Sequence, residues 1–112
     1  MEDDLVARGR VLRIETRGRV TGRPARAVVG FVERPDGSLA ISAGSSGAGW
    51  ARNLLGDPSC VVTIGDTAFA GVATEATGTE HVAAVRELIL KYGTPAESLG
   101  TGPTFVVRPA GV

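Results

Sequence analysis

The sequence has few of the residues on which most enzyme active sites are built. Its 112 residues include one cysteine and one histidine. A single cysteine excludes an internal disulfide and a C-x-x-C metal site, and a single histidine leaves no histidine-based zinc site. Cys60 begins an apolar run and His81 lies early in an amphipathic segment, so we expect both to be structural. We therefore expect no metal site and no Ser-His-Asp or Cys-His catalytic machinery.

The chain also lacks a net charge and a long apolar run. Its formal net charge is zero at pH 7, so composition offers no argument for nucleic-acid binding. No apolar segment approaches the ~18 residues of a membrane-spanning helix. Residues 1–10, MEDDLVARGR, are acidic and have no hydrophobic secretory segment. The expectation is a cytoplasmic protein without a membrane span or a nucleic-acid partner.

What is present is an ordinary globular composition with an uneven distribution of charge. Hydrophobic residues make up 43% of the chain and charged residues 21%, which indicates a folded domain rather than disorder. The length suits one domain, residues 1–112, with one core. Residues 1–26 hold seven arginines against four acidic residues, and the remainder holds five basic against eight acidic residues. The positive charge is therefore concentrated near the N-terminus.

The densest part of this basic region is the stretch 17–26, RGRVTGRPAR, which contains four arginines and two glycines. Arginine side chains bind phosphate or carboxylate through two parallel contacts, and glycine lets the backbone approach a ligand closely. Thr21 adds a hydroxyl donor. The stretch is consistent with a polyanion site and equally with a solvated hairpin loop. These ten residues alone do not separate the two interpretations.

Strand-like runs are short and mostly separated by turn signals. Gly30 lies inside the second run and suggests a bulge or a place where a ligand or another backbone comes close. The short connections favour hairpins, which predicts a mainly β fold: a six-stranded, mostly antiparallel barrel with one main helix packed outside. The expected strands are residues 11–16, 25–33, 38–43, 60–64, 67–76 and 104–108. We expect the last strand at an edge of the sheet, where a second copy of the chain could cover it.

Three segments predict helices: residues 3–8, residues 50–55 and residues 80–92. The last is the strongest, because apolar residues recur in it at helical spacing. Thr79 is the expected N-cap, and Gly93 marks the C-terminal end. The expected apolar face consists of Val82, Val85, Leu88, Ile89 and Tyr92.

A glycine-rich segment, residues 44–50 (GSSGAGW), precedes the short helix at residues 50–55. Glycines before a helix start can form an anion-binding site, although the spacing matches neither a dinucleotide fingerprint nor a Walker loop. A plain flexible loop is the alternative. Trp50, the only tryptophan, is either a core anchor or an aromatic wall against a flat ring system, and Arg52 and Asn53 could face the same pocket.

No obvious nucleophile, general base or pair of catalytic carboxylates is evident in the sequence. If the protein is an enzyme, a bound organic cofactor must carry the reaction. Arginines beside an aromatic plate would suit a phosphorylated molecule similar to an isoalloxazine.

Three sequence motifs are similar to those of a known protein family. The first is TRGRVTGRP at residues 16–24, similar to T-x-G-R-[KR]-[ST]-G-x-P. The second is WARNLLGDP at residues 50–58, similar to W-x-x-N-L-x-x-[ND]-P. The third is the hairpin VVTIGDTAFAG at residues 61–71. With these three motifs in this order, the chain resembles the deazaflavin (F420)-dependent nitroreductase and quinone reductase family of actinobacteria. That family belongs to the flavin-binding split β-barrel superfamily.

The resemblance implies a split β-barrel that binds coenzyme F420 in a groove, with FMN as the alternative cofactor. The residues it implies as cofactor contacts are Arg19, Thr21, Arg23, Arg26, Ser42, Gly44, Trp50 and Asn53. Tyr92 matches a position near the substrate, so it is the one candidate on the catalytic side. The family also suggests a small-molecule substrate and a homodimer.

Three functions remain open on these grounds. The first is an oxidoreductase in which reduced F420 delivers a hydride to a quinone, nitro or activated-alkene substrate. The second is a non-catalytic carrier of F420, FMN, haem or a lipid in the same groove. The third is an interaction domain with an empty groove.

Overall fold

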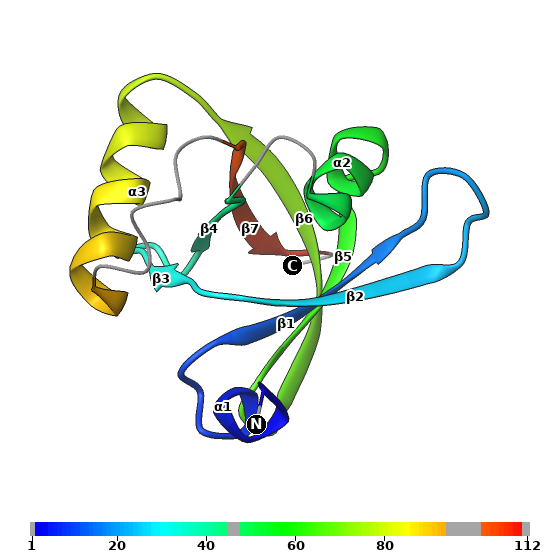
Figure 1. Cartoon of the computed structure of the whole chain (residues 1–112), viewed down its shortest axis with the longest axis horizontal. Helices are drawn as coiled ribbons and strands as arrows, with labels where there is room; N and C mark the ends of the chain where they lie inside the picture. Colours follow the sequence, from blue (N-terminus) through cyan, green and yellow to red (C-terminus); the bar gives the residue numbers. More distant parts are fainter. Residues whose placement is uncertain (1, 45–47, 94–101, 111–112) are drawn as a thin grey trace.

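The computed structural model describes residues 2–44, 48–93 and 102–110, which form seven strands and three helices (Figure 1). In chain order these are α1 (Glu2–Ala7), β1 (Leu12–Arg17), β2 (Pro24–Val29), β3 (Val32–Glu33), β4 (Leu39–Ser42), α2 (Gly49–Gly56), β5 (Ser59–Ile64), β6 (Thr67–Ala76), α3 (Thr79–Tyr92) and β7 (Thr104–Pro109). The strands form one sheet in the order β2-β1-β5-β6-β7-β4-β3, and all neighbours are antiparallel. The predicted mainly β, antiparallel fold is confirmed.

The extra strand arises because the run predicted at residues 25–33 is divided in two. β2 pairs with β1, whereas β3 pairs with β4 at the opposite edge of the sheet. Only Gly30 and Phe31 separate the two pieces. Because consecutive residues join its two edges, the sheet must curl until those edges meet, as in a barrel. A Cβ atom at Gly30 would lie 2.9 Å from the Tyr92 ring, so the group that comes close to this glycine is a side chain instead of the expected ligand or backbone.

The edge position expected for residues 104–108 is wrong. β7 lies between β6 and β4, and β2 and β3 form the edges. Strand neighbours joined by hairpins follow from the sequence. β7, however, comes after a helix and a long connection, so tertiary packing decides which gap in the sheet it enters.

The curled sheet encloses the main core, and α3 covers a second, smaller core outside it. β4 serves both, because Leu39 and Ile41 face inward while Ala40 faces α3. The buried members of the main core are Leu12, Ile14, Phe31, Leu39, Ile41, Ala43, Ala51, Leu54, Cys60, Val62, Ala73, Phe105 and Val107. The smaller core consists of Val32, Ala40, Ala84 and Leu88, with Tyr92 packed against it.

The helix α3 differs in detail from its prediction. Ala84 and Leu88 are its buried residues, whereas Val82 is 56% exposed, so the buried face is narrower than the sequence pattern suggested. Thr79 is the first residue of the helix and not its N-cap. Gly78 holds the cap position with φ +60°, without a side-chain hydrogen bond, which glycine allows at little cost.

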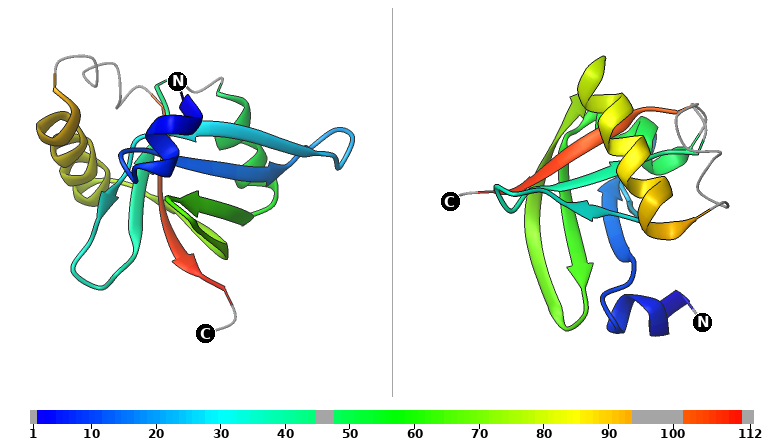
Figure 2. Two further views of the ribbon diagram at one scale, coloured as in Figure 1. Left: turned by 90° about the horizontal axis from the view of Figure 1, so that it is seen from below. Right: turned by 90° about the vertical axis from the view of Figure 1, so that its left-hand side faces the viewer.

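The two longer helices lie on different sides of the sheet. α2 contacts β1 and β2, while α3 contacts β3, β4 and β7, and Figures 1 and 2 show them well separated, with the β1–β2 hairpin extending beside α2. In the part of the chain that the structure describes, no helix is long and apolar enough to cross a membrane.

Candidate functional site

The arginine-rich stretch forms the tip of the β1–β2 hairpin, and two glycines shape it. The Gly18 N–H donates to the Arg23 carbonyl at 2.8 Å, and the Gly22 N–H donates to the Gly18 carbonyl at 2.9 Å. Gly22 has φ +74°, and a Cβ atom at Gly18 would lie 2.9 Å from the Arg23 carbonyl oxygen. Both positions therefore require glycine. The result is a tight loop that presents its arginine side chains outward.

A buried amide ties this loop to α2. Asn53 is 4% exposed, and its Oδ1 accepts from the Arg19 backbone N–H at 3.3 Å and from Arg19 Nη1 at 2.9 Å. Its Nδ2 donates to Thr16 Oγ1, itself 2% exposed, at 3.0 Å. The network of Thr16, Asn53 and Arg19 therefore links β1, α2 and the hairpin loop. The hydrogen bond from Nη1 also holds the Arg19 guanidinium in place before any ligand binds.

A cavity of about 480 Å³ lies beside this network, between the hairpin and the start of α2. The Trp50 side chain lines it, half-buried, and packs against Phe105 with the ring centroids 6.0 Å apart at 59°. Trp50 is thus both a core anchor and a cavity wall. The cavity is lined by Gly18, Arg19, Val20, Thr21, Ala25, Arg26, Ala27, Gly49, Trp50 and Asn53.

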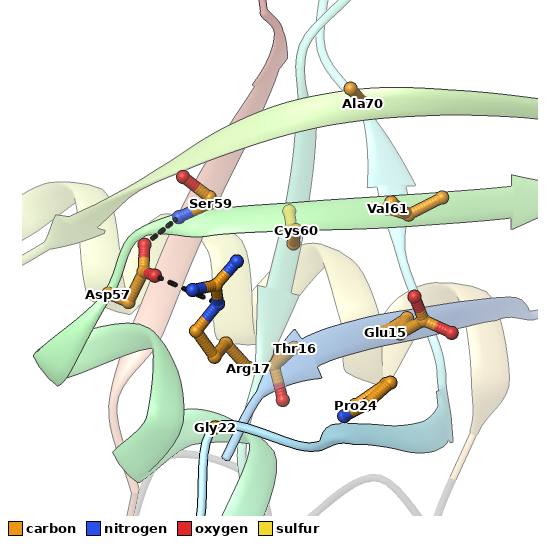
Figure 3. Close-up of a pocket in the computed structure, with 10 residues that line it drawn as sticks. All are labelled: Glu15, Thr16, Arg17, Gly22, Pro24, Asp57, Ser59, Cys60, Val61 and Ala70. Atoms are coloured by element: carbon orange, nitrogen blue, oxygen red, sulfur yellow. Dashed lines mark hydrogen bonds and ion pairs between the residues drawn. The ribbon is translucent and has the colours of Figure 1, made fainter. Parts of the chain in front are cut away.

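The hollow continues around the base of the hairpin. A cavity of about 240 Å³ shares Arg19 and Asn53 with the first and adds Arg17 and Asp57. Those two residues also line a further cavity of about 380 Å³ on the outer side of β1 and β5 (Figure 3). Together the three cavities form a groove with arginines along it. An elongated anionic ligand could follow such a groove.

An acidic residue faces the arginines in this groove. Asp57 Oδ1 accepts from the Ser59 backbone N–H at 3.0 Å, and its Oδ2 lies 3.8 Å from Arg17 Nε (Figure 3). The hydrogen bonds from Ser59 lower the pKa of Asp57, and the charge of Arg17 adds to this effect. Asp57 therefore stays ionised and keeps Arg17 partly neutralised.

Five of the residues predicted from the sequence lie around one cavity: Arg19, Thr21, Arg26, Trp50 and Asn53. Arg26 is exposed and paired with Glu15, with Nε 2.9 Å from Oε1. Arg23 belongs to the same loop, but it is exposed and its structural contacts are through the backbone: its N–H donates to Thr21 Oγ1 at 3.3 Å.

Three other predicted residues lie elsewhere. Ser42 is at the end of β4, 5% exposed, and faces α3 instead of the cavity. Gly44 is exposed and stands directly before residues 45–47, which are outside the described residues. Tyr92, on α3, is remote from the arginine loop (Figure 1).

The Tyr92 hydroxyl makes structural hydrogen bonds. It accepts from the Phe31 N–H at 3.0 Å and donates to the Arg10 carbonyl at 2.7 Å. The neighbouring Lys91 Nζ donates to the Phe31 carbonyl at 2.7 Å. Tyr92 thereby clamps the end of α3 to the crossing between β2 and β3, and the ring occupies the space that Gly30 leaves.

Sequence reasoning missed two groups of residues. Thr16 is part of the buried network. It opens the motif at residues 16–24, but it was not predicted as a site residue. His81 and Thr104 contact each other at 2.7 Å, and Thr104 also contacts Ser42. No sequence pattern links these three, since 62 positions separate Thr104 from Ser42.

Comparison with known proteins adds to this geometry. An F420-H2 dependent reductase (FDR-A) has a similar structure, with a TM-score of 0.73 at 23% identity over 88% of this chain and 94% of that one. HutZ, the heme storage protein from Vibrio cholerae, gives a TM-score of 0.75 at 20% identity over 96% and 86% of the two chains. A structure described as a domain-swapped dimer gives 0.72 at 21% identity over 95% and 92%. At these identities the likeness establishes the split-barrel fold.

No curated protein matches the sequence. The model of the F420H(2)-dependent quinone reductase family, by contrast, matches residues 5–102. That match includes the arginine loop, the whole of α2 and the whole of α3. The chain therefore belongs to the F420H(2)-dependent quinone reductase family, an enzyme family whose cofactor is F420.

Proposed function

We propose that this chain is an oxidoreductase that transfers a hydride from reduced F420 to a quinone, nitro or activated-alkene substrate. Family membership supports the cofactor and the class of enzyme. The observation that carries the site is the Thr16–Asn53–Arg19 network, which holds one arginine beside Trp50. A side chain that is already ordered loses less entropy when it binds a ligand. Arg19 is therefore the best-prepared anion contact in the groove.

The residues around the cavity fit an anionic cofactor with a flat ring. Guanidinium groups bind phosphate and carboxylate through paired hydrogen bonds, and Arg19 and Arg26 both line the cavity. The pair between Arg26 and Glu15 is exposed, so the free energy for exchanging Glu15 for a ligand anion is small. Trp50 offers an aromatic surface. The volume of about 480 Å³ is in the range of ligand pockets, roughly 300–1,000 Å³.

In this proposal the cofactor supplies the hydride, and the protein supplies binding and orientation. Arg19 and Arg26 hold anionic groups, Thr21 adds a hydroxyl donor and Trp50 bounds one side of the ring. Asn53 acts through Arg19. Cofactor contacts by Arg23, Ser42 and Gly44 stay predictions, as does the place of Tyr92 near the substrate.

Titration of F420 fluorescence with the purified protein tests the site. Arg19→Ala is expected to weaken binding at least ~10-fold, because charge-assisted hydrogen bonds contribute about 1.5–3 kcal/mol. Arg86→Ala is the matched control, since Arg86 is an exposed arginine on the remote helix α3, and it should bind F420 as the wild type does. Equal affinity of both variants would contradict the site, and no micromolar binding by the wild type would contradict the function.

Turnover separates an enzyme from a carrier. Reduced F420 should be oxidised by the wild type in the presence of a quinone, and nitro and activated-alkene compounds should then be compared by kcat/KM. A protein that binds F420 tightly but oxidises it no faster than the buffer does would be a carrier.

The second candidate is a non-catalytic carrier of another ligand, and the structural likeness to HutZ favours haem as that ligand. The single histidine is the natural axial ligand to test. A haem titration followed by the Soret band should show no stoichiometric binding if the reductase proposal is right. Tight haem binding that is lost in His81→Asn would favour the carrier.

A homodimer also belongs to this proposal. The similar structure described as a domain-swapped dimer supports it, and so does an apolar patch on the outer face of β5 and β6. In this patch Val61 is 39% and Val72 41% exposed, and Ala70 pairs directly with Val61. Light scattering should give twice the mass of 11.5 kDa, and Val61→Glu should shift the protein towards the monomer.

A further inference from the structure

The charge of the groove changes sign from one end to the other. Among the described residues, the first cavity, of about 480 Å³, is lined by two arginines, Arg19 and Arg26, and by no acidic residue. The second cavity, of about 240 Å³, is lined by Arg17, Arg19 and one acidic residue, Asp57. The third cavity, of about 380 Å³, is lined by Arg17 and two acidic residues, Asp57 and Glu15. The formal charge of the lining side chains therefore falls from +2 through +1 to −1 along the groove.

Asp57 lies where the sign changes. It lines both the second and the third cavity, and its side chain is 40% exposed, so a ligand in either cavity can approach the carboxylate. Oδ1 is held by the Ser59 N–H at 3.0 Å, while Oδ2 lies 3.8 Å from Arg17 Nε. Figure 3 shows Asp57 and Glu15 around the same pocket, with Arg17 next to Asp57. The carboxylate therefore has a fixed position at the entrance to the third cavity.

The local structure needs the side-chain oxygen of residue 57 but not its charge. An asparagine in place of Asp57 also offers an oxygen to the Ser59 N–H, and both residue types form turns of this kind. The pair with Arg17 contributes little to stability, because the two side chains are 71% and 40% exposed and 3.8 Å apart. The negative charge at this position therefore acts mainly on what enters the groove.

A ligand with a row of anionic groups encounters this change of sign. F420 has a phosphate followed by a tail of glutamates, and each further glutamate adds a carboxylate. Arg19 and Arg26 attract the anionic groups that lie in the first cavity. A carboxylate that reaches the third cavity lies close to Asp57 and Glu15, and like charges at short distance repel each other. The groove is thus favourable to the first part of such a tail and unfavourable to its continuation.

We infer that Asp57 limits the length of the anionic tail that the groove holds. It does so in two ways: its charge repels a carboxylate in the third cavity, and it keeps Arg17 from binding one. This inference rests on the proposed function and specifies its cofactor as F420 with a short tail. Asp57 is thus a specificity-determining residue and not a catalytic one.

Fluorescence titration with two forms of F420, one with a single glutamate and one with at least five, tests the role of Asp57. The wild type should bind the long form no more tightly than the short form. Asp57→Asn should bind the long form about 3- to 10-fold more tightly than the wild type does, the range expected for one exposed charge and one released arginine. Its affinity for the short form should be that of the wild type, which also shows that the variant is folded.

The matched control is Asp66→Asn, which removes one negative charge from the exposed turn between β5 and β6, at the end of β5 opposite to Ser59. It should bind both forms as the wild type does. Adding Arg17→Gln to Asp57→Asn should reverse the gain for the long form, because the released guanidinium is then absent.

Equal affinity of the wild type and Asp57→Asn for the long form would overturn this inference. So would the same gain for both forms of F420, or the same gain in Asp66→Asn, because either result would be a general effect of net charge. A gain that persists without Arg17 would overturn the part assigned to that arginine. Failure of the wild type to bind either form would instead overturn the proposed function.

Discussion

Two buried polar networks, one on each side of the sheet, have a similar construction but end in different side chains, an arginine and a histidine. Near α2, Thr16 accepts from Asn53, which binds Arg19. Near α3, Ser42 accepts from Thr104, which contacts His81. In both, a strand hydroxyl less than a tenth exposed leads through a buried partner to a side chain that reaches solvent.

The difference lies in the terminal group. Arginine stays protonated at every accessible pH and cannot exchange its proton during catalysis, so the first network can only hold a fixed charge. The second network ends in the half-buried His81 imidazole, whose 2.7 Å contact with Thr104 ties the first turn of α3 to β7. We therefore expect the two networks to separate in experiments: the first should control F420 binding, and the second should affect only the stability of the fold.

Breaking the first network at its centre should have the largest effect. Asn53→Leu keeps the branched shape of the side chain but removes the partner of the Arg19 amide, of the Arg19 guanidinium and of the buried Thr16 hydroxyl. Leaving buried polar groups unpaired should lower the free energy of unfolding by about 2–4 kcal/mol, measured by urea denaturation. F420 affinity should fall at least ~10-fold with it. Arg52→Ala, on the exposed side of the same helix, is the control and should change neither quantity.

Tyr92→Phe tests whether the tyrosine belongs to either network. Removing the hydroxyl leaves the Phe31 N–H without its 3.0 Å acceptor, so unfolding should become easier by about 1–3 kcal/mol. F420 affinity, kcat and its pH profile should stay at the wild-type values, because this clamp is separate from both networks. A selective loss of kcat would place Tyr92 on the substrate side, as the family resemblance implies.

A crossed pair of matched substitutions separates the networks directly. Thr16→Val and Thr104→Val each remove one buried hydroxyl from a strand and keep its shape, and each should cost about 1 kcal/mol of stability. Thr16→Val should weaken F420 binding and leave the pH profile of kcat intact. Thr104→Val should leave F420 binding unchanged. The comparison fails if both variants weaken F420 binding to the same extent.

Leu90→Gln should have the smallest effect on stability, and it serves as the baseline for the other variants. Leu90 is 78% exposed on α3 and lies outside both networks. Exposed substitutions of this kind change stability by no more than about 0.5 kcal/mol, and binding and turnover should not change. A larger loss of stability, or a change in the apparent mass by light scattering, would mean that another surface covers this residue in solution.

Local sequence signals accounted for much of the fold. The antiparallel hairpins and the approximate positions of α2 and α3 follow from turn residues and apolar spacing, which act over a few residues. The glycines and arginines of residues 17–26 likewise predicted an arginine-bearing loop. Family motifs further predicted the five residues that meet at the cavity of about 480 Å³.

The sequence pattern failed where partners are distant along the chain. It assigned residues 104–108 to an edge. It also did not predict that the Asn53 amide is buried against Thr16 and Arg19. β4 is covered on both faces, so alternation alone does not predict on which side of the sheet its end residue, Ser42, lies.

The amino-acid sequence by itself determined the mainly β character of the chain, its hairpins and helices, and the position of its arginines, because each depends on residues close to one another in the chain. Tertiary structure alone decided that β2 and β3 lie at opposite edges, that Asn53 holds Arg19, and that His81 meets Ser42 through Thr104. Arg19 and Asn53 are 34 positions apart in the sequence, and Ser42 and Thr104 are 62 positions apart. These contacts form because the sheet curls and because different helices cover its two faces. A pattern of residues along the chain contains no information about either feature.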